Sequence, residues 1–279
     1  MTTASVALHV DTDTEHGGRW TSLMGGGRQW LWHRTEPRRA LARPGSAFVD
    51  AGGVEECIPT VRGTPDHGDA WSRPWRQIGN TAVVECQDFT LARRIREHRG
   101  AIICEYRLSA RPGYRFIWAA HALLELSDSA TLEAPTGTPT RIFPESAPHI
   151  RRNWPAGTPW LEGPWPAPEG FRLDCLGPDD GTAVGAVLRL GIHGSSAVRV
   201  VDSRDSLRML LEVDSQPIAV ALWRNLSGYP ATSPYRSVGI EPMLGSTFCL
   251  AEAESSDAAV VPTTGEMSWR LTVTAEQTT

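Results

Sequence analysis

Two histidines and one glutamate stand in sequence contexts that suit proton transfer. His67 precedes a glycine in a polar stretch, where the backbone can approach a ligand closely. His121 lies in the apolar run 116–126, and an imidazole there can exchange a proton near neutral pH. Glu241 follows a short apolar stretch and precedes Pro242, which favours extended backbone before it. A carboxylate in such a strand is costly to bury unless it has a partner or a task.

Each of these residues also has an ordinary structural explanation. His67 could be a turn residue bonded to local backbone, and His121 could be a core histidine with its polar atoms satisfied. Glu241 could be the ion-pair partner of a nearby arginine. The three positions taken one at a time therefore leave both interpretations open, and the elements that carry them must be considered.

Alternation of apolar and polar residues predicts strands at many places in the chain. The pattern is clear over 101–108 and 266–273, where apolar side chains recur at every second position. Shorter runs of the same kind occur at 82–87, 115–126, 183–192, 197–202, 207–213 and 218–223. Turns rich in glycine and proline separate these runs, and helical periodicity is scarce. The sequence predicts an all-β protein with a sandwich or barrel architecture.

The segment 135–168 has a different composition from the rest of the chain. It holds nine of the 21 prolines and three tryptophans. Flexible linkers lack such aromatic residues, so we expect a long loop packed over the sheet, where it could rim a site. No repeat or domain boundary is visible, and residues 1–279 are predicted to form a single domain.

Composition excludes several classes of partner. The chain has 27 basic and 32 acidic residues and a net charge of -5, which argues against nucleic acid or an anionic membrane. The five cysteines are scattered, so neither a disulfide framework nor a structural zinc site is expected. No signal peptide and no apolar run of about 18 residues is present, and we expect a cytoplasmic protein.

Taken in order along the chain, these segments resemble the galactose mutarotase-like (aldose 1-epimerase) family. The likeness covers nearly the whole chain and rests on the order of the motifs, because none of them is specific alone. The segments that carry it are Gly18–Leu23, Trp30–Trp32, Gly52–Gly68, the strand with His121, Ala221–Asn225, Glu241-Pro242, Leu250-Ala251 and Gly265–Leu271.

The resemblance implies a β-supersandwich with a sugar-binding cleft on a concave sheet face. By position, Glu241 would be the general base that removes the anomeric hydroxyl proton. His121 would be the general acid at the ring oxygen, and His67 a polarising partner beside it. Opening a hemiacetal needs such a base and acid together, each contributing roughly 10²–10⁴-fold, and it requires no metal or cofactor.

The resemblance also implies contacts to a sugar substrate. Arg62, Arg73 and Asp174 are candidates for binding hydroxyl groups. Trp71 and Trp223, with Trp75, are the tryptophans we expect to pack against a sugar face. Asp69 is a further candidate, in a segment that departs from the Phe-Ala-Arg of hexose-6-phosphate mutarotases. Its negative charge would discourage a phosphate at Arg73.

Two alternative functions remain open. A non-catalytic carbohydrate-binding protein on the same scaffold would keep the aromatic surface without needing an acid and a base together. A glycosidase would need two carboxyl groups at a set separation, with Glu55, Glu56, Asp66 and Asp69 as the candidates. Adjacent residues of a strand point to opposite faces, which argues against Glu55 and Glu56 as that pair.

Overall fold

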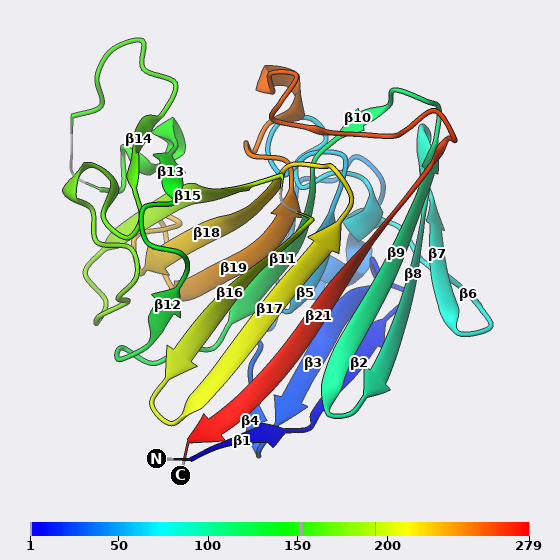
Figure 1. Ribbon diagram of the computed structural model, residues 1–279. Coiled ribbons are helices and arrows are strands. Elements are labelled where there is room, and N and C mark those ends of the chain that lie inside the picture. The colour runs from blue at the N-terminus through cyan, green and yellow to red at the C-terminus, as the bar shows by residue number, and fades with distance from the viewer. Residues whose placement is uncertain (1, 151–152, 193, 279) are drawn as a thin grey trace.

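Two large antiparallel β-sheets lie face to face in the protein (Figure 1). The structure is a computed structural model that describes residues 2–150, 153–192 and 194–278. Within those ranges the helical elements are short 3₁₀ turns of three to five residues. They are η1 (Pro37–Leu41), η2 (Ala70–Ser72), η3 (Pro144–Ser146), η4 (Pro168–Gly170) and η5 (Leu250–Glu252). The all-β class predicted from the sequence is confirmed.

The first sheet has nine strands among the described residues. In spatial order they are β12 (Thr131–Glu133), β16 (Ser195–Asp202), β17 (Asp205–Val213), β21 (Glu266–Thr278), β9 (Ala101–Ala110), β8 (Phe89–His98), β7 (Thr81–Glu85) and β6 (Arg76–Ile78), and β1 (Thr3–Val6) also pairs with β21. The pairing of β1 with β21 brings the two ends of the chain side by side (Figure 1).

The second sheet has ten strands among the described residues and carries the polar residues of interest. In spatial order they are β14 (Leu161–Pro164), β13 (Pro139–Ile142), β15 (Thr182–Gly191), β18 (Ile218–Leu226), β19 (Arg236–Leu244), β11 (Trp118–Leu124), β5 (Val54–Cys57), β3 (Arg19–Gly25) and β2 (Leu8–Asp13), and β4 (Arg28–Gln29) also pairs with β3. A small separate pair joins β10 (Arg115–Phe116) to β20 (Ala259–Val260).

The strands expected from alternation are present. The runs 101–108 and 266–273 are β9 and the first part of β21, and they pair with each other. The apolar positions of both strands lie in the core between the sheets, whereas their polar neighbours face solvent. Period-2 patterning therefore identified strands because one face of each is buried.

The segment 135–168 is only partly the loop that the sequence suggested. Its strands β13 and β14 form an antiparallel pair, and β13 continues into the second sheet by pairing with β15. Pro139 and Pro164 lie opposite each other at one end of this pair. Proline is tolerated at such strand ends because no ladder hydrogen bond is lost there, and the proline content therefore concealed a pair of short strands.

A buried charge cluster links the two sheets. Glu56 on β5 of the second sheet accepts hydrogen bonds from Arg93 Nη1 at 2.7 Å and from the hydroxyl of Tyr106 at 2.9 Å. Arg93 and Tyr106 belong to β8 and β9 of the first sheet, and Trp118 Nε1 on β11 donates to the other Glu56 oxygen at 2.7 Å. Each oxygen of this buried carboxylate is thus engaged, as burial of a charge requires.

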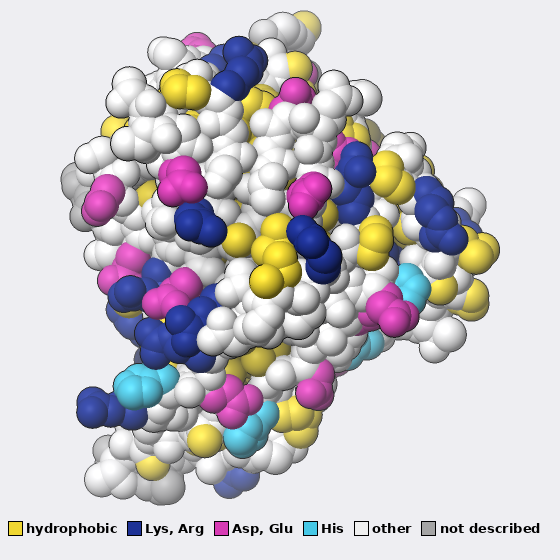
Figure 2. Space-filling model, turned by 90° about the vertical axis from the view of Figure 1, so that its right-hand side faces the viewer, with side chains coloured by type: hydrophobic (Ala, Val, Ile, Leu, Met, Phe, Trp, Pro, Cys, Tyr) yellow, Lys and Arg dark blue, Asp and Glu magenta, His cyan; other side chains and the backbone are white. Residues whose placement is uncertain are grey.

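One face of the surface mixes charges of both signs. Figure 2 shows arginine and acidic side chains interleaved over this face, with apolar side chains scattered among them. This face therefore lacks the single-sign field typical of nucleic-acid binding. Among the residues that the structure describes, no helix is long and apolar enough to cross a membrane.

Candidate functional site

The second sheet carries a pocket of about 530 Å³ on the face turned away from the first sheet. His121 on β11 and Glu241 on β19 both line it. These two strands pair antiparallel in a register that sets Leu123 opposite Gly239, so His121 and Glu241 also lie opposite each other. The pleat of the sheet turns both side chains to the same side, although 120 positions separate them in the chain.

Glu241 is a buried carboxyl group with few hydrogen-bond partners among the described residues. Its Oε1 lies 3.6 Å from Nε2 of His121, and its Oε2 has no hydrogen-bond partner among the described residues. Burial raises the pKa of Glu241 above its ordinary value, and the nearby charge of His121 offsets part of that rise. The arginine ion pair considered from the sequence is absent among the described residues. A carboxylate of this kind has the proton affinity and the free oxygen of a general base.

A glycine makes room for this carboxylate. Gly239 lies two residues before Glu241 on the same face of β19, and a Cβ added there would be 2.6 Å from Glu241 Oε1. The same Cβ would lie 3.1 Å from the Cβ of Trp223 on the neighbouring strand β18. The sequence Gly-Ile-Glu thus places an acid over an open position of the sheet.

His67 reaches the same pocket from the loop that follows β5. Its backbone has a φ of 58°, in the left-handed region that few non-glycine residues adopt. The next residue, Gly68, has a φ of 78°, and a Cβ there would lie 2.1 Å from the carbonyl oxygen of Ile58. The His67 ring lies 5.1 Å from the His121 ring, centroid to centroid. The loop therefore joins His67 to the pair on the sheet, and the three residues line one pocket.

Two of the other predicted substrate contacts also line this pocket, namely Arg62 and Trp223. Arg62 lies in the loop before His67 and is exposed at the rim. Trp223 is half buried on β18, and Tyr229 packs against its ring edge at a centroid distance of 5.8 Å. Both are available to a ligand in the pocket.

The remaining predicted contacts lie elsewhere. Trp71 is completely buried, and its Nε1 donates to the carbonyl oxygen of Asp66 at 3.1 Å. Asp69 and Arg73 are within 3.7 Å of each other, and neither lines the pocket.

Asp174 forms a bidentate ion pair with Arg172, also away from the pocket. Trp75 is buried against the guanidinium of Arg93. None of these five predicted contacts, Asp69, Trp71, Arg73, Trp75 and Asp174, lines the pocket. They were chosen from the kinds of residue that the resemblance implies at a sugar, whereas burial and ion pairing in the fold decide where these side chains point.

An aromatic and charged wall that was not predicted from the sequence forms one side of the pocket. The hydroxyl of Tyr235 donates to Asp50 Oδ2 at 2.6 Å, and its ring stacks on Trp32 with centroids 5.2 Å apart. The guanidinium of Arg34 lies 4.7 Å from the centre of the Tyr235 ring. Tyr229 lines the pocket from the same loop. Tyrosines within a stretch rich in glycine, serine and proline were the available signal.

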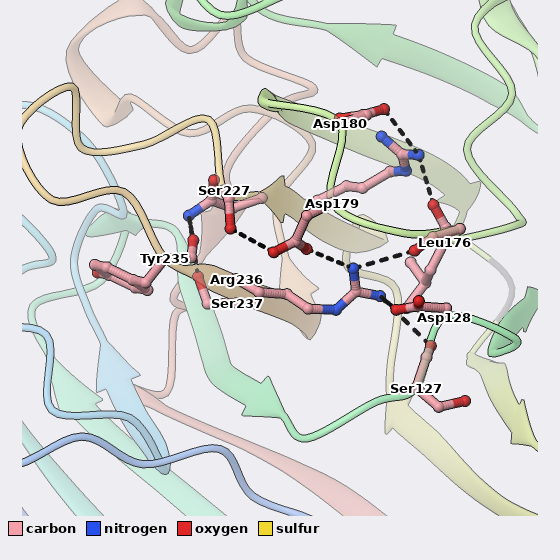
Figure 3. A network of polar contacts seen from close by, with 12 residues as sticks. Ser127, Asp128, Leu176, Asp179, Asp180, Ser227, Tyr235, Arg236 and Ser237 are labelled. Carbon is pink, nitrogen blue, oxygen red and sulfur yellow. Dashed lines mark hydrogen bonds and ion pairs between the residues drawn. The ribbon is translucent and has the colours of Figure 1, made fainter.

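This tyrosine loop, residues 227–235 between β18 and β19, is fixed at its base. The buried side chain of Asn225 donates to the carbonyl oxygens of Tyr229 at 2.9 Å and Tyr235 at 2.8 Å. Arg236 donates to Asp179 at 2.9 Å, and Asp179 accepts a further hydrogen bond from Ser227 at 2.6 Å (Figure 3). Because both ends of the loop are held, the pocket wall is largely formed before a ligand arrives.

Of the four carboxyl groups considered for a glycosidase, only that of Asp66 lines the pocket. Glu55 and Glu56 point to opposite faces of β5, as the pleat predicts, and neither lines the pocket. Glu55 is held by Arg39 at 3.0 Å, and burial raises its pKa to about 7 although Arg39 acts against that rise. Among the described residues no cluster of three or more ligating side chains could hold a metal ion.

Comparisons with known proteins identify the fold. No protein-family model matches the chain, and no curated protein matches it. Among solved structures, the Slr1438 protein of Synechocystis superposes with a TM-score of 0.69 at 13% identity, covering 99% of this chain and 96% of the other. A galactose mutarotase related enzyme from Lactobacillus acidophilus gives 0.64 at 14% identity, covering 98% and 97%.

A galactose mutarotase-like protein from Lactobacillus casei gives a TM-score of 0.61 at 14% identity, covering 98% of this chain and 100% of the other. Further similar structures, from Escherichia coli and Salmonella typhimurium, are named as candidate aldose 1-epimerases or mutarotases. The resemblance to the galactose mutarotase-like family is confirmed at the level of fold, together with its two-sheet β-sandwich.

Proposed function

We propose that this protein is an aldose 1-epimerase, which interconverts the α and β anomers of a monosaccharide. The observation that carries the proposal is the buried carboxyl group of Glu241 beside His121 in an open pocket, with one oxygen that has no partner among the described residues. The fold likeness to proteins named as mutarotases supports the same reaction class. Fold alone would not be sufficient, because one scaffold can host unrelated functions.

The reaction would proceed by a base and an acid acting on the two oxygens bonded to the anomeric carbon C1. Glu241 takes the proton of the anomeric hydroxyl O1, and His121 donates a proton to the ring oxygen O5. The C1–O5 bond breaks, a C1=O1 double bond forms, and an open-chain aldehyde results. Rotation about C1–C2 then turns the other face of the aldehyde to O5, and both protons return as the ring closes.

The spacing of the two groups suits this chemistry. O1 and O5 are bonded to the same carbon, so the base and the acid must lie within a few ångströms of each other. The 3.6 Å between Glu241 Oε1 and His121 Nε2 meets that requirement. His67, with its ring 5.1 Å from that of His121, would polarise the same end of the sugar. Positioned proton transfers of this kind contribute roughly 10²–10⁴-fold each.

Sugar binding would rely on the side chains around this pair. The half-buried ring of Trp223 offers an apolar face for the C–H groups of a sugar. Arg62 and the wall formed by Arg34, Asp50 and Tyr235 offer donors and acceptors for hydroxyl groups. A single domain over residues 1–279, a cytoplasmic location and the lack of a nucleic-acid or membrane partner stay predictions from the sequence.

Anomer exchange measured directly would test the proposal. Freshly dissolved α-glucose, α-galactose and a panel of other aldoses would be followed by polarimetry and by NMR exchange, with wild type and Glu241→Gln. We expect wild type to speed equilibration of at least one sugar and Glu241→Gln to lose most of that effect. Glu85→Gln is the matched control, because Glu85 is exposed on β7 and 70% accessible.

Two other results would point elsewhere. Sugar binding without faster equilibration would favour the non-catalytic carbohydrate-binding protein, which the aromatic wall could equally serve. Cleavage of an aryl glycoside would favour a glycosidase, in which another carboxyl group of the pocket, such as Asp50 or Asp66, would act together with Glu241.

A further inference from the structure

The His67 ring is held on several sides by neighbouring side chains. Phe48 stacks on it with centroids 3.6 Å apart and an interplanar angle of 10°. Asp66 Oδ1 lies 3.1 Å from its Nδ1. The His121 ring meets it nearly edge-on, at an interplanar angle of 80°. An aromatic face, a carboxylate and a second imidazole thus restrict both the tilt and the rotation of one ring.

Phe48 is itself fixed in place. Its ring makes edge contacts with Trp71 at 5.0 Å and with His121 at 5.6 Å, centroid to centroid. Trp71 is completely buried and anchored by its hydrogen bond to the backbone of Asp66. Phe48 therefore packs between a rigid core tryptophan and the two histidines, and it can limit how far the His67 ring turns.

Asp66 faces one ring nitrogen of His67 at hydrogen-bond distance. Burial alone would raise the pKa of Asp66, but its hydrogen bonds to His67 and to the Phe48 backbone N–H, with the charge of Arg62, bring it below the ordinary value. A carboxylate only accepts hydrogen bonds, so the facing Nδ1 must be protonated. The other nitrogen, Nε2, then serves the pocket, as acceptor in the neutral ring or donor in the charged one.

The backbone around His67 adds to this restraint. The left-handed conformation at His67 is closed by a hydrogen bond from its N–H to the carbonyl oxygen of Val61 at 3.0 Å. A non-glycine residue stays in this conformation only where its surroundings hold it there. The backbone conformation of the loop therefore fixes the direction in which the His67 side chain points.

We propose that Phe48 and Asp66 are positioning residues that hold His67 with its Nδ1–H toward Asp66 and its Nε2 toward the sugar. The role of this arrangement rests on the proposed function. Ionisable groups near His67 in the pocket are Asp66 and Arg62 from its own loop, His121 from β11 and Glu241 from β19. Neither Phe48 nor Asp66 needs to contact the reacting atoms for this role.

The first experiment reads the tautomer directly and does not depend on catalysis. ¹⁵N imidazole NMR spectra of histidine-labelled protein would be recorded for wild type, Asp66→Asn and Asp66→Ala, with His67→Gln to assign the signal. We expect the Nδ1–H form in wild type and a shift toward Nε2–H in Asp66→Ala. Asp66→Asn keeps an acceptor oxygen and should lie between them. Asp88→Ala, an exposed loop carboxylate, is the control.

The second experiment reads catalysis on the sugar that wild type equilibrates. Asp66→Ala and Phe48→Leu are expected to lower kcat by about 10- to 100-fold, a typical effect of residues that orient a functional histidine. KM should stay within about threefold if the sugar still binds. Phe48→Tyr keeps the stacked ring and should restore most of the activity. Thermal melting would verify that each variant folds.

The possible outcomes separate this proposal from the proposed function. An unchanged tautomer in Asp66→Ala would overturn the positioning role, as would a changed tautomer with full activity. Wild type that accelerates no sugar would instead overturn the proposed function, and the NMR experiment would then still decide whether Asp66 orients the ring.

Discussion

Two buried glutamates on the second sheet differ in what surrounds them. Glu56 is 0% exposed between the sheets, and its two oxygens accept three hydrogen bonds, one of them from an arginine. Glu241 is 3% exposed on the other face, and one of its oxygens has no partner among the described residues. Burial is therefore shared by a structural acid and a candidate base. The unmet hydrogen-bonding capacity, next to an open pocket, distinguishes the candidate base.

Two hollows of the surface support the same conclusion. A groove of about 580 Å³ lies on the solvent face of the first sheet and is slightly larger than the pocket of the second sheet. Its charged side chains form a cross-strand ladder, in which Arg270 lies 3.8 Å from Glu105 and 3.9 Å from Glu212. These charges satisfy one another in solvent, so volume alone does not identify a functional site.

The largest effect is expected at Glu241. Glu241→Gln keeps the shape of the side chain but cannot take a proton, so kcat for anomer exchange should fall by roughly 10²–10⁴-fold. Polarimetry measures this loss, and circular dichroism should show an intact fold. Full activity of the variant would remove the contrast drawn between Glu241 and Glu56.

Replacing Arg93 should lower stability, whereas replacing Glu241 should lower catalysis. Arg93→Met would leave the Glu56 carboxylate buried without its cation and is expected to cost about 3–5 kcal/mol of unfolding free energy. Urea unfolding measures this cost. The matched control is Arg76→Met, where the ion pair with Glu85 is about two-thirds exposed, and we expect a change within about 0.5 kcal/mol. Similar losses at the two sites would mean that burial of the Glu56 cluster is not what stabilises it.

Trp223 tests the apolar side of the pocket. Trp223→Ala removes the half-buried ring from the wall and should raise KM by about tenfold, or about 1.4 kcal/mol, because sugar packing is lost. kcat should change less than threefold, since the acid and base remain in place. A change confined to kcat would show that Trp223 supports Glu241 rather than the sugar.

The smallest effect concerns stability and pH. A glutamate whose pKa is raised by folding binds its proton more tightly in the folded state, so the contribution of Glu241 to stability falls as pH rises above about 4.3, the pKa of glutamate in the unfolded chain. Glutamine does not titrate. Glu241→Gln should therefore gain stability relative to wild type with rising pH. The total gain should be about 1.4 kcal/mol for each unit by which folding raises the pKa of Glu241.

Urea midpoints at pH 4, 6 and 7.5 measure this gain. Below the pKa of the unfolded chain the carboxyl is protonated in both states, and the difference should be smallest there. A constant difference across the range would mean that the Glu241 carboxylate finds a partner in the folded protein.

The three central residues of the site could be identified from the sequence, although not from their local context alone. Local context left His67, His121 and Glu241 each open to an ordinary structural role, and the ordered resemblance to the galactose mutarotase-like family selected them. Arg73 was chosen because the resemblance implies an arginine at the sugar, and Trp71 because aromatic rings pack well on sugars; the fold places Arg73 beside Asp69 and buries Trp71. Residue type does not reveal where a loop directs a side chain.

The sequence by itself determined the strands and their faces. Alternation over 101–108 and 266–273 follows from a pleat with one buried side, and adjacency in a strand sends Glu55 and Glu56 to opposite faces. These are local consequences of backbone geometry, which neighbouring residues suffice to express.

Tertiary structure alone decided which strands meet. The pairing of β11 with β19 brings His121 opposite Glu241, and the loop between β18 and β19 brings Tyr235 to Asp50 across 185 positions of sequence. Such pairings depend on the packing of whole sheets, because a strand's pattern specifies its buried face but not its neighbour. The chemistry proposed here depends on those long-range neighbours.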